Sequence, residues 1–223
     1  MSLIWGQLVA TTGKTIRRPR TTIPLSRDRI EAHALELIEE QGIDLFSIRK
    51  LAERLGCQAM SIYNHFPSKA HIFDALMARV LGSIPIPDRS LTPAQRLREF
   101  AQSWRALARE SPKFYLWLSI CQWNSVAGTR FLSEMLACFY DAGFTPQRAA
   151  YGFRVLGYYV QGVATDESSG YANGPSSVDP IGAETLARDF PQVAEAHAFF
   201  TNEHFDNVFE LGFGALLRKL ELE

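Results

Sequence analysis

The stretch IRKLAERLGCQAMSIYNHFPSKAHIF, residues 48–73, decides the fold of this 223-residue chain. Apolar residues recur at helical spacing from Ile48 to Leu55, and Gly56 follows them as a helix-ending residue. A second short helix is predicted over Ala59–Phe66, which a proline then ends. A helix of under two turns is not stable alone, so its neighbours must hold it and leave one face free. Two short helices joined by a tight turn have the layout of a helix-turn-helix, whose second helix enters the DNA major groove.

Helical segments on both sides of this stretch complete a small N-terminal domain, predicted over residues 26–82. Ser26 caps a helix over Arg27–Gln41, and another helix is predicted over Lys69–Leu81. Residues 1–25 show no sustained periodicity, so we predict a flexible basic arm that contacts DNA, with a solvated tail of no consequence as the alternative. The arm residues chosen as candidate DNA contacts are Arg17, Arg18 and Arg20.

Charge is distributed unevenly, although the formal net charge is only −1. Residues 1–82 hold eleven basic and eight acidic residues, a net charge of +3, whereas residues 83–223 have a net charge of −4. A basic front and an acidic remainder suit a chain that touches a polyanion with its front only.

Neither a membrane protein nor a secreted protein is expected. No apolar run reaches the roughly 18 residues of a membrane-spanning helix, and the charge order at the start is not that of a secretory signal. The cysteines Cys57, Cys121 and Cys138 form no metal-like pair. We therefore expect reduced thiols in a cytoplasmic protein that has no membrane partner.

The remainder, residues 83–223, is also predicted to be helical. Gly82 and several prolines interrupt the pattern and mark the domain boundary. Three times afterwards a Ser or Thr stands directly before a proline, which is typical of a helix start. We predict helices over 93–110, 112–123, 128–142, 146–165, 183–188 and 191–220, with a loop at 166–180. The fold class is all-α: a three-helix helix-turn-helix head and a larger helical body, with about nine to ten helices.

Residues from Ile30 to Leu81 resemble the tetracycline-repressor (TetR) family of transcriptional regulators. The resemblance rests on ALELIEEQGIDLFSIRKLAERLG (34–56) and on SIYNHFPSK (61–69). The Tyr63-x-His65-Phe66 ending is similar to that of the branch that contains the tetracycline repressor itself. The resemblance implies an all-helical homodimer with a DNA-binding head and a body for ligand binding and dimerisation.

The resemblance also implies roles at the DNA surface. The positions that match phosphate contacts are Ser47, Tyr63, His65 and Lys69. Arg49 matches a position whose guanidinium suits guanine O6 and N7, and the base-reading positions are Gln58, Ala59, Met60 and Ser61. Ala59 and Met60 lack strong hydrogen-bonding groups, so they would contact thymine methyl groups. Packing on the small core is the alternative for Tyr63, and a core or surface histidine is the alternative for His65.

The body carries many aromatic residues, and ligand pockets are mainly apolar with a few polar groups. The predicted ligand-binding residues come from helices that we expect to converge: Trp104, Trp117, Cys121, Met135, Phe139, Phe153 and Gln161. An aromatic residue at helical spacing is more often core than pocket lining, so core packing is the alternative for each. These residues predict a small hydrophobic ligand, with an aromatic one preferred.

A dimer interface is predicted on the two long helices. Gly152, Gly157 and Gly162 would be a liability in a helix unless another helix approaches closely. The last helix carries a wide apolar stripe, made of Phe205, Val208, Phe209, Gly212, Phe213, Leu216 and Leu220. We predict a four-helix interface between two copies, with internal core as the alternative.

No metal, cofactor or catalytic site is predicted, although the resemblance to the tetracycline branch leaves open a divalent ion delivered with the ligand. His197 and His204 have no zinc-like spacing, and no nucleophile elbow or phosphate loop occurs. The predicted function is a sequence-specific DNA-binding regulator, expected to be a repressor that a small hydrophobic ligand releases from a palindromic operator. It is not expected to be an enzyme. The alternative is a helical small-molecule-binding or enzymatic domain with a vestigial DNA-binding head, and an activator or architectural role also stays open.

Overall fold

Within residues 24–170 and 174–223, the ranges that the computed structural model describes, all regular secondary structure is helical. The head contains α1 (Arg27–Gln41), α2 (Ile48–Leu55), α3 (Ala59–Tyr63) and α4 (Lys69–Ser83). The body contains α5 (Pro93–Glu110), α6 (Pro112–Leu118), α7 (Val126–Asp141), α8 (Pro146–Ser169), α9 (Ala183–Asp189), α10 (Pro191–Ala196) and α11 (Phe205–Lys219). Two 3₁₀ turns, η1 (His197–Phe199) and η2 (Asn202–His204), join α10 to α11. The predicted all-α class is confirmed.

Five helices, α1, α2, α5, α7 and α8, begin directly after a Ser or Thr whose side chain accepts from a free N–H group. The Ser26 hydroxyl accepts from the N–H of Arg29 at 3.2 Å, and Thr92 forms a reciprocal capping box with Gln95. Between α2 and α3 the chain turns at Gly56, whose φ of +66° lies in the left-handed region that favours glycine. This turn fixes the angle at which α3 leaves α2.

Four helices differ clearly from the prediction. Helix α8 continues to Ser169, into the predicted loop at 166–180. The recognition helix α3 ends at Tyr63 instead of Phe66, and α6 ends at Leu118 instead of residue 123. The predicted helix 191–220 is broken into α10, two 3₁₀ turns and α11. Around the break Phe199 and Phe200 are exposed, so little burial of apolar surface favours a continuous helix there.

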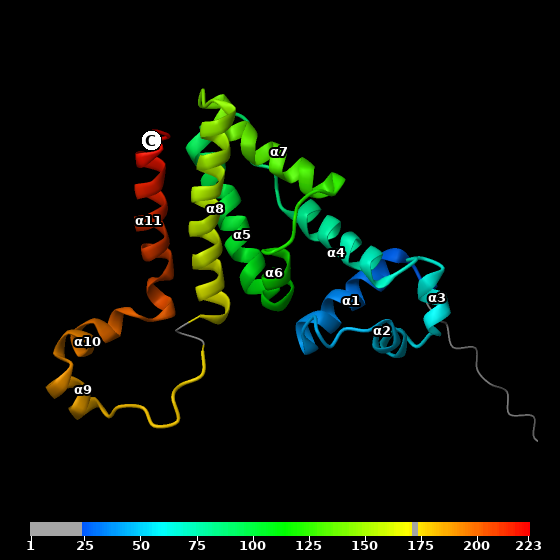
Figure 1. The fold of residues 1–223 in the computed structure, drawn as a ribbon, viewed down its shortest axis with the longest axis horizontal. Coiled ribbons are helices and arrows are strands. Elements are labelled where there is room, and N and C mark those ends of the chain that lie inside the picture. The colour runs from blue at the N-terminus through cyan, green and yellow to red at the C-terminus, as the bar shows by residue number, and fades with distance from the viewer. Residues whose placement is uncertain (1–23, 171–173) are drawn as a thin grey trace, which may run out of the picture.

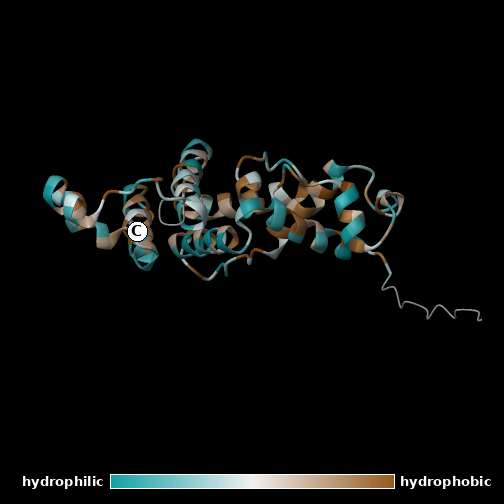
Figure 2. Cartoon of the chain, turned by 90° about the horizontal axis from the view of Figure 1, so that it is seen from below, coloured by the Kyte–Doolittle hydropathy of each residue, from teal (hydrophilic) through white to brown (hydrophobic). Residues whose placement is uncertain are grey.

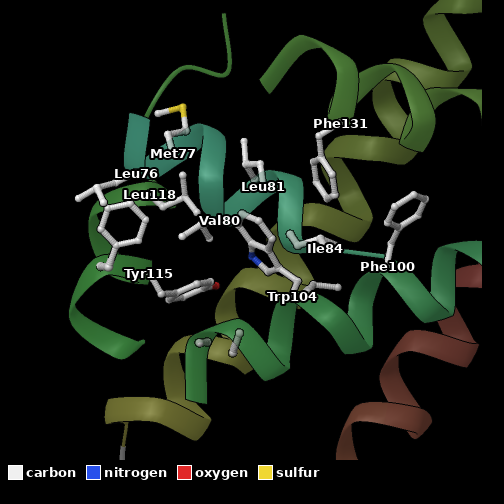
Figure 3. Close-up of a cluster of buried hydrophobic side chains, with 14 of the residues drawn as sticks. Leu76, Met77, Val80, Leu81, Ile84, Phe100, Trp104, Tyr115, Leu118 and Phe131 are labelled. Carbon is white, nitrogen blue, oxygen red and sulfur yellow. The ribbon is translucent and has the colours of Figure 1, made fainter. Parts of the chain in front are cut away.

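Helix α4 joins the head to the body. In Figure 1 it runs from the group of α1, α2 and α3 towards α5 and α7, while α8 and α11 lie side by side at the far end of the molecule. Figure 3 shows Trp104 of α5 lying among Val80, Leu81 and Ile84 at the end of α4. The hydrophobic core is therefore continuous from the head into the body, although the proline-containing segment between α4 and α5 divides the two in sequence.

The surface follows the usual division between apolar interior and polar exterior. Figure 2 shows hydrophobic residues gathered along the middle of the molecule, with hydrophilic residues on the outer turns. Helices α9 and α10 stand apart from the rest of the body in Figure 1. Along the described residues, no helix has both the length and the hydrophobicity needed to cross a membrane.

Candidate DNA interface and ligand cavity

The short helix α3 is anchored to the head at its middle and just beyond its end. Ile62 is fully buried. The Arg27 guanidinium donates to the carbonyl oxygen of His65 at 2.7 Å and lies 4.1 Å from the centre of the Phe66 ring. On the opposite side, Met60 is 66% exposed and Tyr63 is 42% exposed. A five-residue helix thus keeps a fixed orientation while it presents side chains to solvent.

Other predicted DNA-contacting residues surround α3. Gln58 is exposed, whereas Ala59, Ser61 and His65 are half-buried. Ser47 caps α2, where its hydroxyl oxygen accepts from the N–H of Lys50 at 3.2 Å. Its O–H hydrogen remains able to donate to a phosphate oxygen. Asn64, which sequence reasoning did not select, is exposed directly after Tyr63.

The two basic residues predicted to contact DNA differ in their surroundings. The Arg49 side chain is 89% exposed and its Nε lies 3.1 Å from Glu53 Oε1 in a surface ion pair. Lys69 Nζ donates to the carbonyl oxygen of Phe46 at 3.0 Å and lies 5.3 Å from the ring centres of Phe46 and Phe73. Lys69 therefore also holds the head core together. Arg17, Arg18 and Arg20 lie outside the described residues.

Arg54 joins α2 to α1 through hydrogen bonds to two glutamates of α1. Its guanidinium donates to Glu40 at 2.5 and 2.7 Å and to Glu36 at 3.0 Å. The hydrogen bonds with Glu40 raise the pKa of Arg54, and the pKa of Glu40 is correspondingly lowered. This contact was not identified from the sequence, because its partners lie 14 and 18 residues away.

The body encloses a cavity of about 480 Å³ between α5, α7, α8 and the segment 119–123 that follows α6. Five of the seven predicted pocket residues line it, namely Trp104, Cys121, Met135, Phe153 and Gln161. Burial raises the pKa of the Cys121 thiol, with a smaller contribution from the charge of Asp74. The lining is mostly apolar, which suits a small hydrophobic ligand.

The other two predicted pocket residues lie elsewhere in the core. Trp117 points towards the head, with its ring centre 5.1 Å from that of Phe73. Phe139 packs against α8 at Gly152, where a Cβ atom would stand only 2.6 Å from the Phe139 ring. Both side chains fill the protein interior, which is the alternative that sequence reasoning had left open for each.

Several lining residues were missed. They are Leu97, Phe100, Ala101, Ser119, Ile120, Gln122, Trp123, Phe131, Leu132, Arg154, Leu156, Gly157, Tyr158, Val160 and Phe213. In the segment 119–123 only Cys121 was predicted, because the apolar spacing there favoured a continuing helix. The exposed Ile120 is a sign that this segment leaves the helix.

A second contact between head and body involves Glu39 of α1. Its carboxylate accepts from the backbone N–H of Phe114 at 2.8 Å and of Lys113 at 3.2 Å. Lys113 Nζ in turn donates to the carbonyl oxygen of Glu40 at 2.8 Å. Helix α6 has no side-chain cap of its own, so Glu39 satisfies the free N–H groups at its start. Because α6 leads directly into the cavity segment 119–123, it connects the cavity to α1.

A buried ion pair holds α5, α8 and α11 together. Arg105 is 0% exposed, and its Nε donates to the Glu167 carboxylate at 2.9 Å. Its Nη2 also donates to Asp206 at 2.7 Å, and its guanidinium lies 4.1 Å from the centre of the Phe209 ring. Burial acts to lower the pKa of Arg105, but the bonds to Glu167 and Asp206 outweigh it and the pKa is raised.

The predicted dimer face divides into an inner and an outer part. Phe209 and Phe213 are buried within the chain, and Gly212 is approached by the Tyr159 hydroxyl of the same chain. Gly157 and Gly162 have no neighbour within 4 Å of a Cβ position. The outward face carries exposed large apolar residues, which are Tyr151, Val155 and Tyr158 on α8 and Val208 and Leu211 on α11.

The described residues contain no group of three or more His, Cys, Asp or Glu side chains that could hold a metal ion. His197 and His204 lie in separate 3₁₀ turns instead of on one helix.

An exposed recognition helix joined to a body with an apolar cavity defines a helix-turn-helix regulator that binds a small molecule. Residues 30–76 match the family model described as "Bacterial regulatory proteins, tetR family". Residues 87–222 match the one described as "Tetracyclin repressor-like, C-terminal domain". The chain belongs to the TetR family of DNA-binding transcriptional regulators.

Individual relatives agree with this assignment. The chain is 28% identical over 203 residues to the tetracycline repressor protein class G of Vibrio anguillarum, covering 88% of this chain and 94% of the relative. The fold is similar to that of Streptomyces coelicolor ActR in complex with actinorhodin, with 24% identity, a TM-score of 0.68 and coverage of 89% and 97%. It is also similar to a single-residue variant of Acinetobacter baumannii TetR in complex with minocycline, with 24% identity, a TM-score of 0.63 and coverage of 89% and 97%.

Proposed function

We propose that this protein is a homodimeric repressor that leaves a palindromic operator when a small, largely apolar ligand fills the cavity. The observation that carries the proposal is Trp104, which lines the cavity and lies among Val80 and Leu81 of α4 and Ile84 directly after it. A ligand that moves Trp104 would therefore act directly on the helix that joins the head to the body. Two proteins of similar fold were crystallised with small molecules, which supports a ligand for this chain as well.

The proposed division of labour follows the two parts of the chain. Residues 1–25 form the basic arm, residues 26–82 the DNA-binding head and residues 83–223 the body that binds ligand and partner. As a transcriptional regulator, the protein would act in the cytoplasm. It would not be an enzyme. The relatives that cover most of the chain are named as repressors, which disfavours an enzymatic body with a vestigial head.

In the proposed complex, each part of the head surface has one role. Arg49, Gln58 and Ser61 donate or accept hydrogen bonds at base edges, and Ala59 and Met60 contact thymine methyl groups. Phosphates are bound by Ser47, Tyr63, His65 and Lys69, while Arg17, Arg18 and Arg20 of the arm add further backbone contacts. Because Met60 is the most exposed large apolar side chain of α3, part of the specificity would come from apolar contact and DNA shape.

The second copy would bind to the outward face of α8 and α11. Exposed Tyr151, Val155, Val208 and Leu211 provide apolar surface there, and Gly162 leaves room for a partner helix. Two-fold symmetry would place the two recognition helices in successive major grooves of a palindrome. A ligand then lowers DNA affinity by favouring a state in which the two helices no longer fit.

The DNA-binding part is tested by fluorescence anisotropy with a palindrome from the region upstream of the gene and a scrambled duplex. We expect tighter binding to the palindrome and a linear loss of log affinity with log salt concentration. Binding without sequence preference at every salt concentration would instead favour the vestigial-head alternative.

The coupling is tested without any ligand by filling the cavity. Gly157 lines the cavity and has free space at its Cβ position, so Gly157→Leu places a side chain where a ligand would lie. We expect operator affinity to fall by at least about tenfold, which corresponds to a typical coupling free energy. Ala150→Leu, at an exposed site on the same helix that does not line the cavity, is the matched control. Operator affinity equal to that of the wild type for Gly157→Leu would count against the cavity as the regulatory site.

A further inference from the structure

Each polar side chain that lines the cavity can donate a hydrogen bond, and all of them except Arg154 are neutral. Ser119, Cys121, Gln122, Trp123, Arg154, Tyr158 and Gln161 are the polar lining residues. None of the described lining residues is Asp, Glu, His or Lys. The guanidinium of Arg154 is therefore the one formal charge on the described lining, and it is positive.

Trp123 contributes a donor that lacks an acceptor. Its Nε1 is buried and has no hydrogen-bond partner among the described residues. The indole ring cannot readily turn to find one, because it is packed between Trp104 at 5.2 Å, Phe131 at 5.6 Å and Phe153 at 6.3 Å between ring centres. Its backbone is held as well, since a Cβ at Gly128 would stand 2.9 Å from Trp123 Cα. An unpaired buried donor costs about 1–3 kcal/mol, which an oxygen atom of a bound ligand would recover.

Arg154 lies at the mouth of the cavity. It lines the cavity and is exposed, as is its neighbour Tyr158. Its Nε donates to the Tyr158 hydroxyl at 2.8 Å, and its guanidinium stands 5.0 Å from the centre of that ring. Among the described residues no carboxylate pairs with it, so its positive charge is available to an anion entering the cavity.

From these contacts we infer that the ligand is a flat aromatic molecule that carries a carbonyl or an ionised oxygen. This inference rests on the proposed function of the cavity. The aromatic walls formed by Trp104, Phe131 and Phe153 suit a flat ring system. Trp123 Nε1 donates to the ligand oxygen, and Arg154 attracts its negative charge. An aromatic lining by itself would also suit a cation, but the lining offers a cation no carboxylate and places a guanidinium at the entrance.

The test uses three naphthalene derivatives that share a ring system and differ in charge: naphthoate, naphthamide and naphthylmethylamine. Their binding to the full-length protein is measured by calorimetry at neutral pH. We expect naphthoate and naphthamide to bind at least about tenfold more tightly than the cationic amine, as one hydrogen bond to a charged or buried group allows. Trp123→Phe should weaken naphthoate and naphthamide and leave the amine unchanged. Arg154→Gln should weaken naphthoate alone. The control Arg130→Gln, at an exposed residue of α7 outside the cavity lining, should change none of the three.

The outcomes separate the inference from the proposed function. If all three compounds bind with equal affinity, the cavity is a ligand site but the oxygen-bearing class is wrong. Equal losses for all three compounds in Trp123→Phe would overturn the assigned donor role in the same way. If none of the three binds, the proposed ligand cavity fails together with the inference. Sedimentation of Arg154→Gln confirms that a change in affinity does not arise from a lost dimer, because Arg154 lies close to the proposed partner face.

Discussion

The head and the body use their aromatic side chains for opposite purposes. In the head, Phe46, Phe66 and Phe73 fill a small core, and the side chains suited to DNA lie outside it. In the body, Trp104 and Trp123 form the wall of a space that is left open. Apart from Lys69, which also contacts Phe46 and Phe73, the proposed DNA-binding surface of the head can therefore be changed without disturbing its core, whereas the cavity surface of the body is part of the core.

Ion pairs show the same difference. Arg54 joins two head helices at the surface, where its partners Glu36 and Glu40 have side chains that are 52% and 53% exposed. Arg105 joins body helices in the interior, where the Glu167 side chain is 1% exposed. Surface pairs are screened by water, while a buried charge depends on its partner. We therefore expect substitutions to separate function from stability in the head and to couple them in the body.

The largest expected effect is on stability in the body. Glu167→Ala leaves the buried Arg105 with Asp206 and Gln102 as its remaining partners in the described part of the chain, and should lower the free energy of unfolding by about 3 kcal/mol. Replacing both charged residues, as in Arg105→Met with Glu167→Leu, should recover most of this loss. Urea unfolding measures both, and Glu40→Ala in the head should change stability far less. If Glu40→Ala lowered the free energy of unfolding as much as Glu167→Ala, the expected difference between the surface ion pair of the head and the buried pair of the body would be wrong.

The next effect concerns DNA recognition, where Arg49 should separate binding from stability and Lys69 should not. Arg49→Ala should cost about 1–3 kcal/mol of operator affinity and relax the preference at one base pair, because we propose that its guanidinium binds a base edge. Lys69→Ala should weaken binding to all sequences and flatten its salt dependence, and it should also destabilise the head because Lys69 binds Phe46. Anisotropy with a panel of single-base variants separates the two. Identical behaviour of both variants on that panel would remove the base-reading role of Arg49.

A smaller effect is expected at the junction. Glu39→Ala removes the acceptor for two N–H groups at the start of α6, a loss typically worth about 1 kcal/mol. Operator affinity should change little, but the affinity difference between wild type and Gly157→Leu should shrink when Glu39→Ala is present in both. Glu110→Ala, at an exposed acid in α5, is the control. An unchanged difference would mean that coupling runs through α4 alone.

The smallest effect is a difference in thiol reactivity. Cys138 is fully buried and Cys121 is half-buried, and burial raises the pKa of both thiols. Less of each is ionised at neutral pH, so alkylation by iodoacetamide should be slow and should accelerate only at a pH higher than an ordinary thiol needs. Mass spectrometry should find Cys57 modified before Cys138, and naphthoate should protect Cys121 but not Cys57. Modification of Cys138 as fast as Cys57 would indicate that the body opens.

The sequence allows the head to be predicted more fully than the body for a physical reason. Ser26, Ser47 and Gly56 act on residues within a few positions, so the starts and turns of α1 and α2 follow from local pattern. The break after Leu118 does not, because apolar spacing continues through the segment that lines the cavity. Trp117 and Phe139 are aromatic residues at helical spacing, as Trp104 and Phe153 are. Only the packing of helices that are distant in sequence places Trp117 and Phe139 in the core instead of the cavity lining.

The contact between Glu39 and α6 has a consequence for how such a protein can diversify. The carboxylate binds main-chain N–H groups, which every residue other than proline provides. Side chains of α6 and of the segment 119–123 can therefore be exchanged to suit a new small molecule without loss of this attachment to the head. One acidic residue on α1 would therefore allow the same DNA-binding head to be combined with bodies that bind different small molecules.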